Sequence, residues 1–128
     1  MTYGDGLANV DLFGLTKFHS LNAGLVTLTA VHPPARFGAL TMDGVRVTGF
    51  KEKGEHLHEW VNGGFMVVDT KALDYIHGDE MWEHGPMERL AADGKLFAFK
   101  HDGFFWPCDT PRDLEYLNEL WRDGKAEW

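Results

Sequence analysis

The chain has 128 residues, 44% of them hydrophobic and 13% aromatic, which is enough apolar material for one domain with a buried core. Its formal charge of -8 excludes the broad basic surface with which proteins bind nucleic acid or anionic membranes. No apolar run reaches the roughly 18 residues of a membrane span, the N-terminus lacks a signal-peptide pattern, and a single cysteine, Cys108, excludes an internal disulfide. We therefore expect a cytoplasmic protein without nucleic-acid or membrane partners, in which a few placed groups or a metal ion hold any anionic substrate.

The first part of the chain predicts a helix followed by strands. Asp11 is a typical N-cap residue, and apolar residues recur after it at helical spacing until the stop signal at residues 22–24. Residues 25–30 are apolar and β-branched and precede two prolines, which is typical of a buried strand. Two extended pieces at 38–41 and 45–50 surround an Asp-Gly pair, a strong hairpin signal. This order of elements favours an α/β fold.

The second part of the chain continues the alternation. A β-rich run at 61–69 contains two adjacent glycines, beside which a backbone can approach a ligand closely. Helical stretches are expected at about 71–77 and 86–92, with a strand at 96–100 and a loop rich in aromatic residues after it. The last helix has the clearest signals, with Thr110 as N-cap, proline at its first position and an apolar stripe. Since there is no repeat or internal linker, the sequence predicts one α/β unit.

Two aspartates are candidate metal ligands. Asp5 lies between two glycines on a turn, and Asp109 precedes the last helix. Magnesium ions that bind together with substrate phosphates typically need only one or two protein carboxylates plus water. Each residue taken alone is more often a turn or capping aspartate, so the pair makes a metal site only if the fold brings the two together.

Three further groups of residues have both a functional and an ordinary interpretation. Glu52 and Lys53 offer an acceptor for sugar hydroxyls beside a cation for a phosphate, although charged pairs at strand ends are usually solvated. His56 and His58 would share one side of an extended segment, but no third metal ligand has convincing spacing. The aromatic residues 104–106 could stack on a base, but in a chain without a basic stripe they are more often core or interface residues.

Five short motifs cover nearly the whole chain. They are Tyr3-Gly-Asp-Gly6, Arg36-Phe-Gly-Ala-Leu40, Phe50-Lys-Glu-Lys53, Asn62-Gly-Gly-Phe65 and Trp106-Pro-Cys-Asp-Thr-Pro-Arg-Asp113. In order and approximate spacing they resemble the motifs of the sugar-1-phosphate nucleotidyltransferase family. One such motif is weak evidence, whereas five in order are specific. Several of them look most like the cytidylyltransferase branch acting on glucose 1-phosphate, with a thymidylyl- or uridylyltransferase of the same fold as the alternative.

This resemblance implies a fold and a set of site residues. The fold would be the C-terminal half of a Rossmann-like nucleotidyltransferase fold, a mixed sheet with flanking helices, with residues 1–128 as a single partial domain. Asp5 and Asp109 would be the Mg²⁺ ligands and, together with Lys53, the catalytic residues. The residues that would line the sugar-phosphate pocket are Gly38, Glu52, Lys53, Asn62 and Gly63.

The resemblance also implies a reaction. A phosphate oxygen of glucose 1-phosphate would attack the α-phosphorus of CTP in line, giving CDP-glucose and pyrophosphate, so that catalysis depends on positioning and charge neutralisation. The N-terminal half of the family, with its glycine-rich triphosphate loop, has no counterpart in the sequence. We therefore expect the isolated chain to be inactive and to associate with that half or with copies of itself. A non-catalytic sugar-phosphate-binding or oligomerisation module is the alternative.

Overall fold

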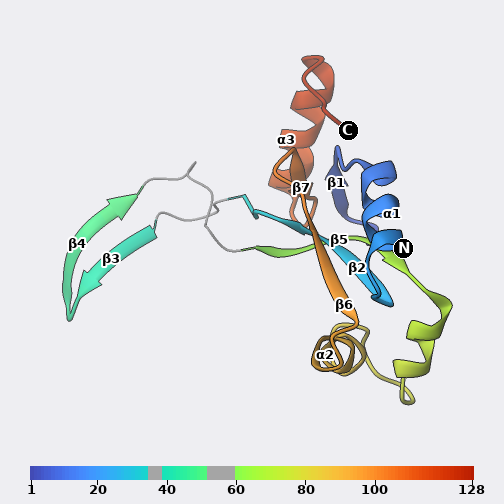
Figure 1. Ribbon diagram of the computed structural model, residues 1–128. Helices are drawn as coiled ribbons and strands as arrows, with labels where there is room; N and C mark the ends of the chain where they lie inside the picture. Colours follow the sequence, from blue (N-terminus) through green and yellow to red (C-terminus); the bar gives the residue numbers. More distant parts are fainter. Residues whose placement is uncertain (35–38, 52–59) are drawn as a thin grey trace.

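The computed structural model describes residues 1–34, 39–51 and 60–128. In chain order its elements are β1 (Gly6–Ala8), α1 (Leu12–Leu21), β2 (Val26–Val31), β3 (Ala39–Asp43), β4 (Arg46–Lys51), β5 (Val61–Val68), the 3-10 helix η1 (Thr70–Tyr75), α2 (Pro86–Ala92), β6 (Leu96–Lys100), β7 (Phe105–Pro107) and α3 (Pro111–Arg122). The main sheet has the order β5-β2-β6, in which β2 runs antiparallel to β5 and parallel to β6. Helices flank this mixed sheet (Figure 1), which confirms the expected α/β class.

Strand β2 lies at the centre of the hydrophobic core. Its β-branched and apolar residues suit a strand that is covered on both faces. On one face, Val26 packs in a buried cluster with Met66, Ala72 and Leu90. This cluster joins β2 to β5, η1 and α2, so the core ties together elements from most of the chain.

Helix α1 covers the opposite face of the main sheet. Its buried residue Leu15 faces the sheet, and Phe18 makes an edge-to-face contact with Phe99 of β6 at a centroid distance of 5.7 Å. The ring nitrogen Nδ1 of His19 lies 3.0 Å from the hydroxyl of the fully buried Thr27. Neighbouring residues of a strand point to opposite faces. Val26 therefore faces the layer of α2, and Thr27 faces the layer of α1.

A second, two-stranded sheet joins regions near the two ends of the chain. Strand β1 pairs antiparallel with β7, with Gly6 opposite Pro107 and Ala8 opposite Phe105. Each strand has only three residues, which is too short to produce a recognisable alternation of polar and apolar residues. The sequence therefore predicted a loop rich in aromatic residues where β7 lies.

The predicted helices are present, with one change of type. The stretch expected at 71–77 is the 3-10 helix η1, which begins after Asp69, whose carboxylate accepts from the backbone N–H of Lys71 at 2.8 Å. It ends where the N–H of Ile76 bonds the carbonyl of Leu73, three residues back, as is typical of 3-10 geometry. None of the helices in the described ranges is long and apolar enough to cross a membrane.

The predicted hairpin is formed by β3 and β4. Asp43 pairs with Arg46 across a turn in which Gly44 has a φ of +57°, a conformation that glycine adopts without strain. Figure 1 shows this hairpin extending away from the main sheet. The predicted site residue Gly38 precedes β3, and Glu52 and Lys53 follow β4 directly. All three lie outside the part of the chain that the structure describes.

Candidate functional site

The ends of β1 and β7 bring together the two aspartates that were predicted as metal ligands. The backbone N–H of Cys108 donates to the carbonyl oxygen of Asp5 at 2.7 Å, one step beyond the pairing of Gly6 with Pro107. Asp5 and Asp109 therefore lie at the same end of the two-stranded sheet, although they stand near opposite ends of the sequence. Both residues are exposed, so a ligand in solution can reach this end.

The two glycines of β5 lie beside this end of the small sheet. A Cβ atom on Gly6 would be 3.8 Å from the carbonyl oxygen of Gly63. A Cβ on Gly63 would overlap with Val31 at 2.7 Å, and Gly64 combines a φ of +79° with an equally close approach to the ring of Tyr3. Packing thus requires both glycines, whereas the sequence had indicated only that they leave room for a ligand.

A hydrogen bond joins the side chains of Tyr3 and Asn62 next to Gly64. The Tyr3 hydroxyl donates to the carboxylate of Glu83 and accepts from Nδ2 of Asn62 at 3.2 Å. The other end of the amide, Oδ1 of Asn62, accepts from the backbone N–H of Gly64 at 3.0 Å. Asn62 was predicted as a site residue, whereas Glu83, in the loop before α2, carries no local sequence signal that could have identified it.

The same contacts shift the pKa values of the phenol and the carboxyl group. Burial, followed by the hydrogen bond to Glu83 and its negative charge, raises the pKa of Tyr3 to about 12. In return, the hydrogen bond from Tyr3 lowers the pKa of Glu83 below its usual range. Around neutral pH the pair is therefore a neutral phenol that donates to a carboxylate.

The loop that carries Asp109 is fixed by the start of α3. Thr110 and Asp113 form a reciprocal capping box, in which Thr110 Oγ1 accepts from the N–H of Asp113 at 3.2 Å and Asp113 Oδ2 accepts from the N–H of Thr110 at 3.0 Å. The other carboxylate oxygen of Asp113 accepts from Nε1 of Trp106 at 3.1 Å, and the ring of Trp106 lies on Tyr116. Asp113 therefore orders both sides of Asp109. In the sequence analysis, Asp113 was only the last residue of the fifth motif.

The aromatic residues of this region contact other parts of the protein. Phe104 stacks on Trp128 at a centroid distance of 5.3 Å, and the ring centroids of Trp106 and Tyr116 are 4.3 Å apart. These contacts support the interpretation of residues 104–106 as packing residues.

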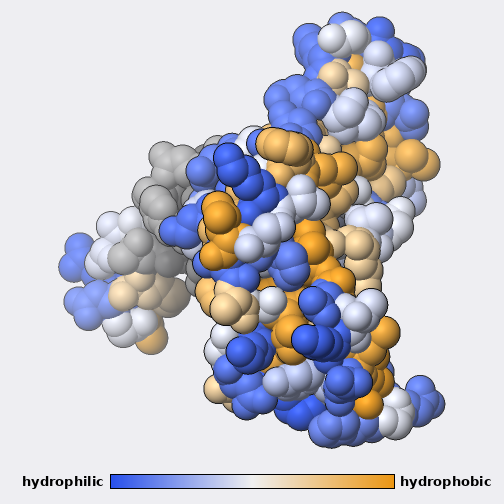
Figure 2. All heavy atoms as spheres, turned by 45° about the vertical axis from the view of Figure 1, so that its right-hand side comes forward, coloured by the Kyte–Doolittle hydropathy of each residue, from blue (hydrophilic) through white to orange (hydrophobic). Residues whose placement is uncertain are grey.

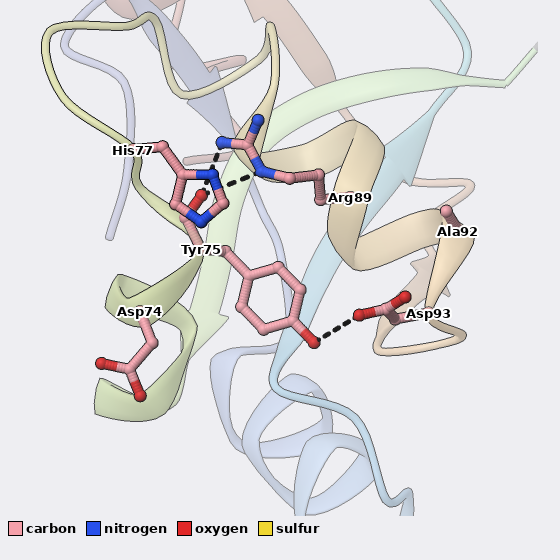
Figure 3. Close-up of a pocket in the computed structure, with 6 residues that line it drawn as sticks. All are labelled: Asp74, Tyr75, His77, Arg89, Ala92 and Asp93. Atoms are coloured by element: carbon pink, nitrogen blue, oxygen red, sulfur yellow. Dashed lines mark hydrogen bonds between the residues drawn. The ribbon is translucent and has the colours of Figure 1, made fainter.

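A hollow of about 370 Å³ lies between η1 and α2 (Figure 3). Its lining residues are Asp74, Tyr75, His77, Arg89, Ala92 and Asp93. The Tyr75 hydroxyl donates to Asp93 at 2.8 Å, which raises the pKa of Tyr75, and Arg89 donates to the carbonyl oxygen of Tyr75 at 2.6 Å and pairs with Glu80. These groups are engaged with one another, and none of the five motifs contributes to the hollow. These contacts therefore hold the loop between η1 and α2 in place.

The remaining predicted residues are not placed relative to this site. Gly38, Glu52 and Lys53, together with the paired histidines His56 and His58, lie outside the described residues. Within residues 1–34, 39–51 and 60–128, no group of three or more His, Cys, Asp or Glu side chains is arranged to hold a metal ion.

Comparison with known proteins supports the resemblance that the motifs indicated. No family model matches the chain. The chain is 44% identical over 128 residues to glucose-1-phosphate cytidylyltransferase of Salmonella typhi, an alignment that covers 99% of this chain and 50% of that protein. It is 37% identical over 130 residues to a probable glucose-1-phosphate cytidylyltransferase of Bacillus subtilis, which covers 100% of this chain and 51% of that one. The chain thus spans about half the length of these relatives.

Solved structures support the same fold. A putative glucose-1-phosphate thymidylyltransferase of Bacillus anthracis superposes with a TM-score of 0.63 at 19% identity, over 94% of this chain and 52% of that one. HddC from Yersinia pseudotuberculosis superposes with a TM-score of 0.61 at 22% identity, over 92% and 52% of the two chains. The chain shares its fold with these structures and is homologous to the sugar-1-phosphate nucleotidyltransferases, a family of enzymes. Within that family, it corresponds to the C-terminal half of glucose-1-phosphate cytidylyltransferases.

Proposed function

We propose that the chain forms the sugar-phosphate side of an enzyme that joins CTP and glucose 1-phosphate to give CDP-glucose and pyrophosphate. The observation that carries this proposal is the meeting of three motif segments at one place. Asp5 and Gly6 of the first motif lie beside Asp109 of the last one through the pairing of β1 with β7. Gly63 of a third motif lies next to Gly6.

In this proposal, Asp5 and Asp109 hold Mg²⁺. Two accessible carboxylates at one end of a small sheet fit this ion, which prefers oxygen ligands and shares its coordination shell with water and substrate phosphates. Bound there, the ion would neutralise charge on the reacting phosphates. The capping box of Thr110 and Asp113 would hold the backbone next to Asp109 in place at this end of the sheet.

The other proposed residues hold the sugar phosphate in position. Gly38, Glu52, Lys53, Asn62 and Gly63 would line its pocket, with Lys53 opposite the phosphate and amide or carboxylate groups opposite the hydroxyls. An oxygen of the sugar phosphate would then form a bond to the α-phosphorus of CTP while the bond to pyrophosphate breaks. Because no protein nucleophile is needed, orientation and charge neutralisation supply the rate enhancement.

The triphosphate has to be bound by groups other than these. We propose that a counterpart of the other half of the relatives supplies them, in the cytoplasm where nucleoside triphosphates are available, and that the chain associates with this counterpart or with itself. Thymidylyl or uridylyl transfer on the same site is the alternative for the base.

Calorimetric titration of glucose 1-phosphate into the chain with Mg²⁺ tests the sugar-phosphate site. Saturable binding that falls at least about tenfold in Lys53→Ala and Asp109→Ala, but not in the exposed control Asp79→Ala, would support the proposal. Absence of binding to the folded chain would contradict it. Adding the other half and CTP, then measuring pyrophosphate release, tests the transfer itself.

A non-catalytic assembly module is a second candidate because apolar side chains are exposed on α3. Leu114 and Trp121 are 53% and 67% exposed and stand seven residues apart, on the same side of the helix. Figure 2 shows further apolar surface on the side of the molecule that it brings forward. Sedimentation of the purified chain and of Trp121→Ser tests this candidate. An assembly module should associate without substrate and lose that association in Trp121→Ser, whereas a monomeric chain would contradict it.

A further inference from the structure

Asn62, Tyr3 and Glu83 form a directed chain of hydrogen bonds. Asn62 Nδ2 lies 3.2 Å from the Tyr3 hydroxyl, and that hydroxyl donates to Glu83. A carboxylate has no hydrogen to donate, so the single hydrogen of the phenol must go to Glu83. The phenol oxygen can then only accept from Asn62, which means that the amide must present its NH₂ group to Tyr3.

The opposite end of the Asn62 amide agrees with this direction. Oδ1 accepts from the backbone N–H of Gly64 at 3.0 Å. One of the two Nδ2 hydrogens is used by Tyr3, so one hydrogen of the amide remains for a ligand. The orientation of a donor next to the proposed sugar pocket is therefore set by a carboxylate that is far away in the sequence.

Glu83 is presented by a braced loop between η1 and α2. Glu80 accepts from the backbone N–H of His77 at 2.6 Å and pairs with Arg89, which also donates through Nε to the carbonyl oxygen of Tyr75 at 3.1 Å. Gly85 ends the loop with a φ of +95°, which favours glycine. Tyr75, His77 and Arg89, which take part in these contacts, also line the hollow in Figure 3.

We propose that Glu83 is a positioning residue for the sugar-phosphate site. Through Tyr3 it holds the Asn62 amide in one orientation, so that the second Nδ2 hydrogen is available to a hydroxyl oxygen of the sugar. This inference rests on the proposed function for the identity of the ligand, whereas the orientation of the amide is a property of the chain by itself.

The orientation is tested first without any ligand, by nuclear magnetic resonance of the ¹⁵N-labelled full chain. The two Nδ2 protons of Asn62, assigned with Asn62→Ala, should have chemical shifts displaced from those of a solvent-exposed asparagine amide, and the proton bonded to Tyr3 should exchange slowly with water. Glu83→Ala should move the shifts toward the solvent-exposed values and speed exchange by about tenfold or more. Glu83→Gln, which still offers an acceptor, should keep most of the displacement, and the exposed control Glu115→Ala should change nothing.

A second variant covers the case in which Glu83→Ala does not fold. Tyr3→Phe keeps the ring against Gly64 but removes the hydroxyl, so it should reproduce the loss at Asn62. Unchanged Asn62 signals in either folded variant would overturn the positioning role.

Affinity for glucose 1-phosphate then links the orientation to the site. Glu83→Ala should weaken binding by about tenfold, and should have no further effect when Asn62 is already alanine. Equal losses in both backgrounds would mean that Glu83 does not act through Asn62 and would overturn the inference. If Asn62 responds to Glu83 but glucose 1-phosphate never binds, the positioning of the amide stands and the proposed function fails.

Discussion

The main sheet and the junction of β1 with β7 are held together in different ways. At the main sheet, Val26 and Leu90 are fully buried, and both faces of β2 are covered. At the junction, two strands of three residues each are fixed by the capping box of α3 and by the bond from Trp106 to Asp113. Burial of apolar surface therefore supports the fold, whereas directed polar contacts place the exposed Asp5 and Asp109.

The largest expected effect is a loss of stability in the buried core of the main sheet. Leu90→Ala should lower the free energy of unfolding by about 3 kcal/mol, because it removes methyl groups from a site with no access to solvent. Urea denaturation measures the loss. Leu73→Ala, at a residue that is 55% exposed, is the matched control and should change stability by less than about 0.5 kcal/mol. Similar losses in both variants would contradict the location of the core.

A smaller effect is expected where the two regions meet. Gly64→Ala should destabilise the chain by about 2 kcal/mol, since it adds backbone strain at positive φ and a clash with the ring of Tyr3. Gly44→Ala also has positive φ but meets no neighbour, so it should cost only the strain, about 1 kcal/mol. Thermal unfolding compares the two. An equal loss would show that Tyr3 does not pack on Gly64.

The polar junction should respond locally to a change in its capping residue. Asp113→Ala removes the acceptor of both Trp106 and Thr110 and should cost about 1 kcal/mol. In ¹⁵N spectra, its largest shifts should fall on the amide of Thr110 and the indole N–H of Trp106, which lose their acceptor, with Val26 unaffected. Shifts spread evenly over the main sheet would argue against a separately fixed junction.

The smallest effect expected is a dependence on pH in the loop between η1 and α2. The hydrogen bond from the N–H of His77, and next the hydrogen bond and charge of Arg89, lower the pKa of Glu80. Its contribution to stability is therefore present above the ordinary glutamate pKa of 4.5 and is lost as the pH falls through the lower value in the folded state. Glu80→Gln should flatten the acid side of the stability profile, while Glu119→Gln should not. Identical profiles for Glu80→Gln and the unmodified chain would contradict this.

Sequence signals were sufficient wherever an element carries its own local pattern. Helix α2 and strand β6 lie where they were expected, and α3 begins at the predicted cap Thr110. In each case a cap, a proline or an apolar stripe lies within the element itself. The pairing of β1 with β7 had no such signal, because it depends on contacts between residues that are far apart in the sequence.

The residues of the candidate site also fall into two groups, those that local motifs identified and those that only the coordinates identified. The motifs identified Asp5, Asp109 and Asn62, and the fold brings the two aspartates to one end of the small sheet. The role of Asp113 as an acceptor for Trp106, and that of Glu83 as the partner of Tyr3, required coordinates, since a hydrogen bond over a long sequence separation leaves no periodicity.

The central claim is that the meeting of the motif segments forms a binding site for a sugar phosphate and Mg²⁺. The most direct test is to titrate glucose 1-phosphate, with Mg²⁺ present, into the ¹⁵N-labelled chain and to follow the backbone amides. The account predicts that the amides of Asp5, Gly63 and Asp109 shift together and saturate at one ligand concentration. Shifts confined to the hollow between η1 and α2, or no shifts in the folded chain, would contradict it.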